Sequence, residues 1–229
     1  MSASDVQTIA AARTLAGKRS CFIGVGRPST AALLARMVHN PELVLVYESG
    51  TIGAKPHRIP LSIGDGELAE TADAVVSVPE MFDYWIGAGR IQVAFLGAAQ
   101  IDRHANLNST VIGDYEHPKT RLPGAGGAPE IAIGCPEVVV IAPHTRRTFV
   151  EKLDFRTTAG GHTTRVITDL GVLEPRDGEL TLTAVHPGVT VAQVREATGW
   201  DLLVPDAVTT SDEPSEAERT ALKELLARG

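Results

Sequence analysis

One glutamate in this sequence stands where a carboxylate could take part in chemistry. Glu48 directly follows the apolar run 43–47, whose unbroken hydrophobicity predicts a buried parallel strand. Ligands of open α/β sheets bind beyond the carboxyl ends of strands, and a carboxylate near apolar strand tops is costly unless it is paired or used. Gly50 would let another group approach the backbone closely. Glu48 is therefore a candidate catalytic carboxylate; the alternative is a surface glutamate at a strand end or a helix cap.

A glycine-containing turn, residues 24–29, precedes this strand in the chain. It has the sequence Gly-Val-Gly-Arg-Pro-Ser, follows a predicted strand and opens a predicted helix. With Glu48 as the acidic residue downstream, it nearly fits the dinucleotide-binding pattern G-x-G-x-x-G, in which a helix N-terminus binds a pyrophosphate. Ser29 replaces the third glycine, so the alternative is a tight strand-to-helix turn that needs its two glycines.

A second glycine-rich segment, residues 123–129, could bind an anion. Gly124, Gly126 and Gly127 offer backbone N–H groups that could hold a phosphate or form an oxyanion hole. The alternative is a flexible linker, although a proline at each end of the segment stiffens it.

Amide side chains gather just after the third predicted strand, again at a carboxyl end. Gln100, Asn106 and Asn108 could orient a polar substrate there. The alternative is that they tie a loop together through Asx turns.

Several other catalytic and metal-binding patterns are absent from the sequence. No G-x-S-x-G elbow and no Walker loop occurs. The histidines include no pair at metal-ligand spacing, so no metal site is expected. Cys21 and Cys135 are too few for a disulfide scaffold, and reduced thiols fit a cytoplasmic location.

The elements that would position these residues alternate between strands and helices. Strands are expected at 21–25, 43–47, 91–96 and 138–141, and a hairpin at 166–173 and 180–184. Helices are expected at 5–16 (with a capping box of Ser4 and Gln7), from Ser29 or Thr30 to about Asn40, at 190–197 and at 214–226. A mostly helical stretch is expected at 67–87. Long loops are expected at 49–66 and 97–134. The pattern predicts an α/β fold, an open, mostly parallel sheet covered by helices with antiparallel additions, in a single domain over residues 1–229.

The overall charge limits the classes of partner. The formal net charge of −7 argues against nucleic acid, and no apolar run of about 18 residues is present to span a membrane. A polyphosphate ligand would need local Arg or Lys side chains, backbone N–H groups or a second protein chain, because the overall field is negative.

Considered together, these segments resemble the β subunit of family I CoA-transferases, in the glutaconate and 3-oxoadipate branch. Residues 44–50 resemble the family's E-x-G motif, residues 97–102 its G-[AG]-A-Q-[IV]-D segment, and residues 124–127 its G-x-G-G oxyanion motif. Other segments that resemble this branch are 106–110, 112–115, 117–121, 166–172 and 186–190. The motifs stand in the family's order, and the resemblance covers nearly the whole chain.

The resemblance implies a ping-pong exchange of coenzyme A between an acyl-CoA and a carboxylic acid, without a metal. Glu48 would form a mixed anhydride and then a glutamyl-CoA thioester, and Gly126 and Gly127 would donate to the oxyanions. The residues that would contact the substrate are Ser49, Gly50, Gln100, Asn106 and Asn108, and those that would contact CoA are Gly26, Gly124 and Ala125.

The resemblance also implies a partner, because such β subunits work with an α subunit. We expect an αβ unit that dimerises to α2β2. Relatives without the transferase glutamate cleave carbon–carbon bonds or decarboxylate CoA esters, so the presence of Glu48 favours a transferase over a CoA-ester hydrolase or C–C lyase on the same scaffold. A non-catalytic subunit that binds a dinucleotide at residues 24–29 is a further alternative. Residues 51–55 and Ala105 depart from the glutaconate pattern and leave the acceptor acid open.

Overall fold

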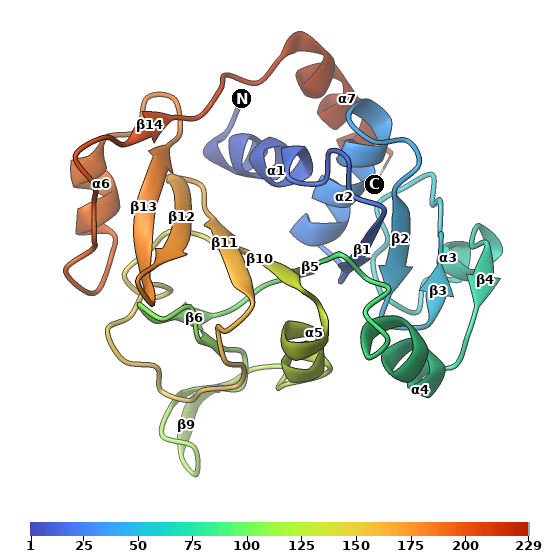
Figure 1. The fold of residues 1–229 in the computed structure, drawn as a ribbon, viewed down its shortest axis with the longest axis horizontal. Helices are drawn as coiled ribbons and strands as arrows, with labels where there is room; N and C mark the ends of the chain where they lie inside the picture. The colour runs from blue at the N-terminus through green and yellow to red at the C-terminus, as the bar shows by residue number, and fades with distance from the viewer. Residues whose placement is uncertain (229) are drawn as a thin grey trace. The chain divides into compact units, whose positions relative to one another are not determined.

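The chain divides into two compact units in the computed structural model, which describes residues 1–228. Unit 1 comprises Met1–Leu96, Gly134–Glu137 and the C-terminal segment from Glu213, and unit 2 comprises Gly97–Ile133 and Val138–Asp212. Each unit contains helices and strands (Figure 1). The expectation of a single domain over residues 1–229 stays a prediction.

Unit 1 is built on a sheet with a parallel centre and an antiparallel edge. Its strands are β1 (Ser20–Ile23), β2 (Val44–Tyr47), β3 (Thr51–Ile52), β4 (Ala74–Val75) and β5 (Val93–Leu96). β1 pairs in parallel with both β2 and β5, and β3 pairs antiparallel with β2 and β4. β1 and β5 are buried along their whole length, as the continuous apolar runs predict.

Three helices of unit 1 pack on one another, and one of them also contacts the sheet. They are α1 (Ala3–Arg13), α2 (Arg27–Val38) and α7 (Glu216–Leu226), and α2 contacts β1 (Figure 1). The capping box of α1 is formed by Ser2 and Asp5, not by Ser4 and Gln7 as the sequence suggested. Ser2 is the N-cap because its side chain accepts a hydrogen bond from the third helical N–H, that of Asp5. Gln7 is instead a buried residue within the helix.

An ion pair joins the first and last helices of unit 1. Arg13 donates to both carboxylate oxygens of Glu218, from Nε at 2.7 Å and from Nη2 at 2.8 Å. The side chain of Glu218 is only 4% exposed. Its burial would raise the pKa of Glu218, but the hydrogen bonds from Arg13 and Ser215 outweigh that effect and lower the pKa to about 2.

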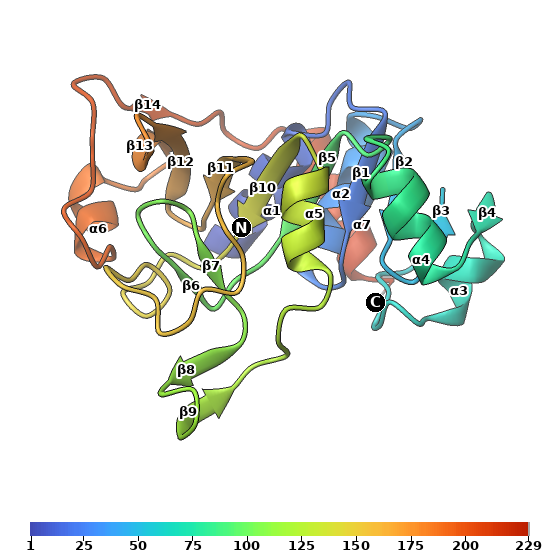
Figure 2. The same cartoon turned by 60° about the horizontal axis from the view of Figure 1, so that its bottom comes forward.

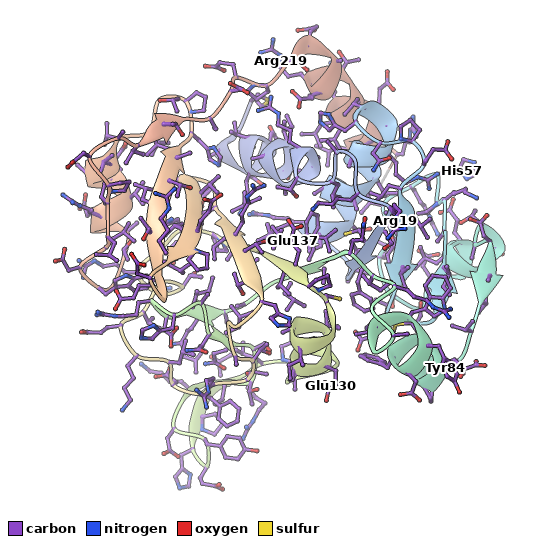
Figure 3. The ribbon with its side chains drawn as sticks, in the orientation of Figure 1. Arg19, His57, Tyr84, Glu130, Glu137 and Arg219 are labelled. Carbon is purple, nitrogen blue, oxygen red and sulfur yellow. The ribbon has the colours of Figure 1, made fainter. Side chains whose placement is uncertain are left out.

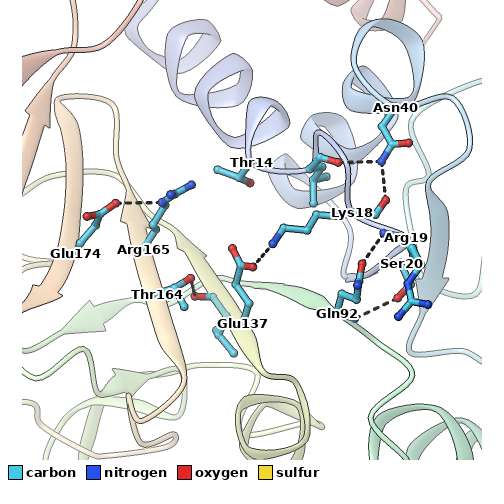
Figure 4. A network of polar contacts seen from close by, with 12 residues as sticks. Thr14, Lys18, Arg19, Ser20, Asn40, Gln92, Glu137, Thr164, Arg165 and Glu174 are labelled. Carbon is cyan, nitrogen blue, oxygen red and sulfur yellow. Dashed lines mark hydrogen bonds and ion pairs between the residues drawn. The ribbon is translucent and has the colours of Figure 1, made fainter.

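Polar side chains also fix the start of β1. The Asn40 amide donates to the carbonyls of Leu15 (2.9 Å) and Lys18 (2.6 Å), and Gln92 accepts from the backbone N–H of Arg19 at 2.6 Å (Figure 4). These bonds attach the end of α2 and the segment before β5 to the chain that enters β1. They help to fix the position of β1, the strand that pairs with β2, and Glu48 directly follows β2.

The segment between β3 and β5 is less uniformly helical than the sequence predicts. It contains α3 (Gly66–Glu70), then β4, then α4 (Val78–Glu80) and a π-helix, η1 (Met81–Ile86). The expected loop 49–66 likewise contains β3. Both strands are two residues long, too short to leave a periodic signal, and β4 is exposed. Tyr84 of η1 is an exposed aromatic side chain on the surface of unit 1 (Figure 3).

Unit 2 contains the predicted hairpin and a parallel strand beside it. β11 (Thr163–Ile167) pairs in parallel with β10 (Glu137–Ile141) and antiparallel with β12 (Gly171–Arg176), which forms a hairpin with β13 (Glu179–Val185). β14 (Thr209–Thr210) pairs in parallel with β13, and α6 (Val191–Glu196) begins at the predicted cap, Thr190 with Gln193. The predicted α/β fold, with parallel strands and antiparallel additions, is confirmed.

The expected loop 97–134 contains two short strand pairs and a helix. β6 (Gln100–Ile101) pairs with β7 (Leu107–Asn108), β8 (Val111–Gly113) pairs with β9 (Pro118–Arg121), and α5 covers Ala128–Gly134. Figure 2 shows the β8–β9 hairpin extending away from β6 and β7. The prediction of an irregular loop was wrong here because these strands are short and most of β9 is exposed, so they show no apolar periodicity.

A buried histidine lies in the interior of unit 2. The ring of His144 stacks on Phe149 with 3.9 Å between centroids, and its two nitrogens lie 3.1 and 3.0 Å from the hydroxyls of Thr168 and Thr198. Burial lowers the pKa of His144 to about 4, although Asp169 acts in the opposite direction. This histidine is therefore neutral in the folded protein near pH 7.

Candidate active site

Glu48 occupies a corner of a tight turn between β2 and β3. The backbone N–H of Gly50 donates to the carbonyl of Tyr47 at 2.9 Å, and Val46 pairs with Ile52 across the hairpin. Glu48 and Ser49 are thus the two central residues of a four-residue turn, and both are half-buried. The sequence correctly placed Glu48 at the carboxyl end of a buried strand, but that strand turns directly into an antiparallel partner.

Gly50 fixes this turn against the neighbouring chain. Its φ is +93°, and a Cβ at this position would lie 2.0 Å from the carbonyl oxygen of Val76. The carbonyl of Gly50 accepts from the N–H of Val76 at 3.0 Å. The close approach that the sequence suggested for Gly50 is therefore present, and the group that approaches is backbone.

Two hydroxyl groups beside Glu48 are buried without a hydrogen-bond partner among the residues that the structure describes. They are Oγ of Ser49 and Oγ1 of Thr51, and Thr51 is itself a buried residue at the start of β3. A buried hydroxyl without a partner costs about 1–3 kcal/mol. Both oxygen atoms are shielded from the surface of this chain, so they add to the cost of forming the turn. The sequence indicated Ser49 but not Thr51, whose type gave no signal.

The segment 24–29 forms a tight strand-to-helix turn in which Gly26, but not Gly24, has a positive φ, and contact of Gly26 with CoA stays a prediction. Gly26 has φ +81° and precedes α2, and its carbonyl accepts from both the N–H and the hydroxyl of Thr30. Ser29, at the position of the third glycine, is fully buried, and its Oγ lies 3.0 Å from the hydroxyl of Tyr47. Burial raises the pKa of Tyr47 to about 12, against the opposing effect of the bond to Ser29, so this phenol is neutral.

The predicted amide cluster in unit 2 is a buried hydrogen-bond network. Asn108 donates to Oε1 of Gln100 at 2.7 Å and to the carbonyl of Val111 at 2.7 Å, and its Oδ1 accepts from the N–H of Thr110 at 2.9 Å. Gln100 in turn donates to Asp154 at 2.9 Å. Gln100 and Asn108 thus use their polar atoms to join β6, β7 and the segment around residue 154.

Asn106 has a similar internal role. Its side chain donates to Asp102 at 2.9 Å and accepts from the N–H of Gly160 at 3.1 Å. These bonds correspond to the loop-tying alternative. Contact of Gln100, Asn106 or Asn108 with a substrate stays a prediction.

The glycine-rich segment runs into the start of α5. The N–H of Gly124 donates to the carbonyl of Ser109 at 2.9 Å, and the carbonyl of Gly127 accepts from the N–H of Ile131 at 2.9 Å. Gly126 is exposed and Gly127 is buried. Because Ser109 occupies the N–H of Gly124, Gly126 is the better candidate donor to an anion, and the roles of Gly124, Ala125 and Gly127 stay predictions.

The structure sorts the candidate residues into two sets. Glu48, Ser49, Gly50 and Gly26 belong to unit 1, while the amide network and the glycine-rich segment belong to unit 2. Among residues 1–228, no group of three or more His, Cys, Asp or Glu side chains is arranged to hold a metal ion. Within the same residues, no helix is both long and apolar enough to cross a membrane.

Comparisons with known proteins agree on one family. The family model described as "Coenzyme A transferase" matches residues 5–197. The β subunit of the 3-oxoadipate CoA-transferase of Pseudomonas knackmussii is 52% identical over 99% of this chain and 94% of its own length. The β subunit of the glutaconate CoA-transferase of Acidaminococcus fermentans is 32% identical over 89% of this chain and 85% of its own. The crystal structure of the Acidaminococcus fermentans glutaconate coenzyme A-transferase superposes with a TM-score of 0.91 at 28% identity, covering 98% of this chain and 94% of that one.

Proposed function

The chain belongs to the coenzyme A transferase family as a β subunit, and we propose that it uses Glu48 to carry an acyl group and then CoA between two acids. The observation that carries this proposal is the position of Glu48, half-buried on a turn that Gly50 holds against Val76. Ser49 lies in this turn and Thr51 directly follows it, and the hydroxyls of both are buried without partners among the described residues.

The proposed reaction proceeds through two covalent states of Glu48. The carboxylate attacks the thioester carbonyl of an acyl-CoA, which gives a mixed anhydride and releases the CoA thiolate. The thiolate then attacks the glutamyl carbonyl, so that the first acid leaves and a glutamyl-CoA thioester remains. An acceptor carboxylate repeats the two steps in reverse and departs as the new acyl-CoA.

Each addition step places negative charge on a carbonyl oxygen. The N–H groups of Gly126 and Gly127 are the proposed donors to this oxygen, and one such donor is worth about 3 kcal/mol of barrier. Closure of the site around substrate is proposed to exclude water from the Glu48 carboxylate and make it a better nucleophile.

As one of the two acids we propose a 3-oxo dicarboxylic acid such as 3-oxoadipate. The support is the 52% identity to the β subunit of a 3-oxoadipate CoA-transferase over nearly all of both chains. Glutaconate is the second candidate acid, on the weaker identity of 32%.

An α subunit is the proposed partner, since the relatives are themselves β subunits. We propose an αβ unit that dimerises to α2β2. Cys21 and Cys135 are both buried, and neither is in a disulfide among the residues that the structure describes, which suits the reducing cytoplasm that we propose as its location.

Trapping of the covalent state tests this function. The chain is co-expressed with its α subunit, incubated with acyl-CoA and reduced with borohydride, and Glu48 is then examined by peptide mass spectrometry. We expect reduction of a glutamyl thioester at Glu48 and loss of transfer in Glu48→Gln. Glu42→Gln is the matched control, because Glu42 is an exposed glutamate in the same unit. Equal transfer by the wild type and Glu48→Gln would refute the proposal, and free acid without a new acyl-CoA would indicate a hydrolase.

A further inference from the structure

A single buried hydrogen bond connects the start of α2 to the residue before Glu48. Oγ of Ser29 lies 3.0 Å from the hydroxyl of Tyr47, and both residues are 0% exposed. Ser29 is in the first turn of α2, and Tyr47 is the last residue of β2. The bond therefore joins two elements at the point where β2 ends and the Glu48 turn begins.

The hydroxyls of Ser29 and Tyr47 each depend on the other for a hydrogen-bond partner. Neither side chain is in contact with solvent, and within residues 1–228 each makes one side-chain hydrogen bond, the one between them. If one hydroxyl is removed, the other is left buried without a partner, which is the costly case; if both are removed, the site is apolar and nearly neutral in stability. A glycine at position 29, as the dinucleotide pattern would have, would leave the phenol of Tyr47 in that costly state.

The Glu48 turn is held at both of its ends. On one side, Gly50 accepts from Val76 and has no room for a Cβ. On the other side, Tyr47 accepts from Gly50 through its carbonyl and bonds Ser29 through its hydroxyl. Glu48 and Ser49 lie between these two attachments and are half-buried.

We propose that Ser29 and Tyr47 are positioning residues for Glu48, and that the segment 24–29 serves catalysis by anchoring this turn. The inference rests on the proposed function of Glu48. In that function one carboxyl group must be reached by a thioester, a thiolate and an acceptor acid in turn. A displacement of about 1 Å at such a centre can lower the rate about 100-fold.

A set of three variants separates positioning from stability. Ser29→Ala and Tyr47→Phe each leave one buried hydroxyl unpaired, and the double variant removes both. Each is assembled with the α subunit, and thermal unfolding, kcat, KM and the rate of Glu48 labelling by borohydride are measured. Thr30→Val is the matched control, because Thr30 bonds the carbonyl of Gly26 in the same turn of α2.

We expect both single variants to lower Tm, and the double variant to recover most of that loss. All three are expected to lower kcat and the labelling rate about tenfold or more, with little change in KM, because Glu48 is less well placed. Thr30→Val is expected to keep the wild-type kcat.

Several outcomes would overturn the positioning role. These are a double variant with wild-type kcat, a change confined to KM, or an equal loss of kcat in Thr30→Val. If the wild-type enzyme transfers CoA but is never labelled at Glu48, the proposed function itself fails. If Glu48 is labelled at the wild-type rate in Tyr47→Phe and in the double variant, only the positioning role fails.

Discussion

Replacement of Gly50 by alanine tests whether the geometry of the Glu48 turn is required. The φ of +93° is strained for any residue with a Cβ, at a cost of about 1–3 kcal/mol. The new Cβ would also lie 2.0 Å from the carbonyl oxygen of Val76, and real Cβ atoms do not come within 3.0 Å of such a neighbour. The turn and the Val76 backbone must therefore separate by about 1 Å or more, a displacement that can cost about 100-fold in rate.

We expect Gly50→Ala to lose about 3 kcal/mol of stability from strain and displacement together, which corresponds to a fall in Tm of about 6–12 °C in a chain of this size. We also expect kcat to fall about 100-fold. The assay combines thermal unfolding with CoA transfer by the complex with its α subunit.

Gly17→Ala is the matched control for this experiment. Gly17 also has a positive φ, +72°, but apart from its two chain neighbours no described residue has an atom within 4 Å of the position its Cβ would take. We expect a loss of about 1 kcal/mol and unchanged transfer, because only the backbone strain remains. The reasoning is refuted if Gly50→Ala loses no more Tm than Gly17→Ala, or if it keeps its kcat within about twofold of the wild type.

Three further predictions concern stability. Arg13→Met should cost about 2–4 kcal/mol, measured by urea unfolding at pH 7, because the buried carboxylate of Glu218 loses the two charged hydrogen bonds that Arg13 donates. Folding lowers the pKa of Glu218, so the ionised carboxylate stabilises the folded state above its ordinary pKa, and this stabilisation is lost as pH falls from about 4.5 towards 2. In Arg13→Met, the fall in Tm over that pH range should therefore be smaller. Folding also lowers the pKa of His144, so the unfolded chain binds more protons than the folded one and stability is lost as pH falls from about 6.5 to 4. When Tm is measured at a series of pH values, His144→Gln should show a smaller fall over this range. A fall equal to that of the wild type would contradict the prediction. Asn108→Ala should lower stability by about 2–3 kcal/mol in urea unfolding, because several groups buried with it lose their partner; a loss below about 0.5 kcal/mol would show that the network is not structural.

The sequence predicted the buried elements and missed the exposed ones, for a physical reason. Long apolar runs such as 43–47 and capping patterns such as Thr190 with Gln193 are local signals, and the structure confirms both. β4 is exposed at both residues and only two residues long, so it carried no hydrophobic pattern. Its pairing with β3 is set by contacts that are not local.

The same distinction applies to the candidate site. The sequence could place Glu48 at a strand end and require a glycine at position 50, because both depend on the local chain. It could not show that Ser29 meets Tyr47, since that contact joins residues 18 apart across a helix and a strand. Nor could it show that the polar atoms of Asn108 are satisfied internally, since residue type alone does not distinguish a ligand from a structural amide.

The ion pair between Arg13 and Glu218 has a consequence for synthesis on the ribosome. It joins residues that are 205 positions apart, and α7 packs on both α1 and α2. Unit 1 therefore cannot close until nearly the whole chain has been translated, whereas the strands of unit 2 are complete before α7 is made. At about 5–20 residues per second, the α1–α2 surface waits on the order of ten seconds for its last helix, and during that interval it is a surface that chaperones can bind.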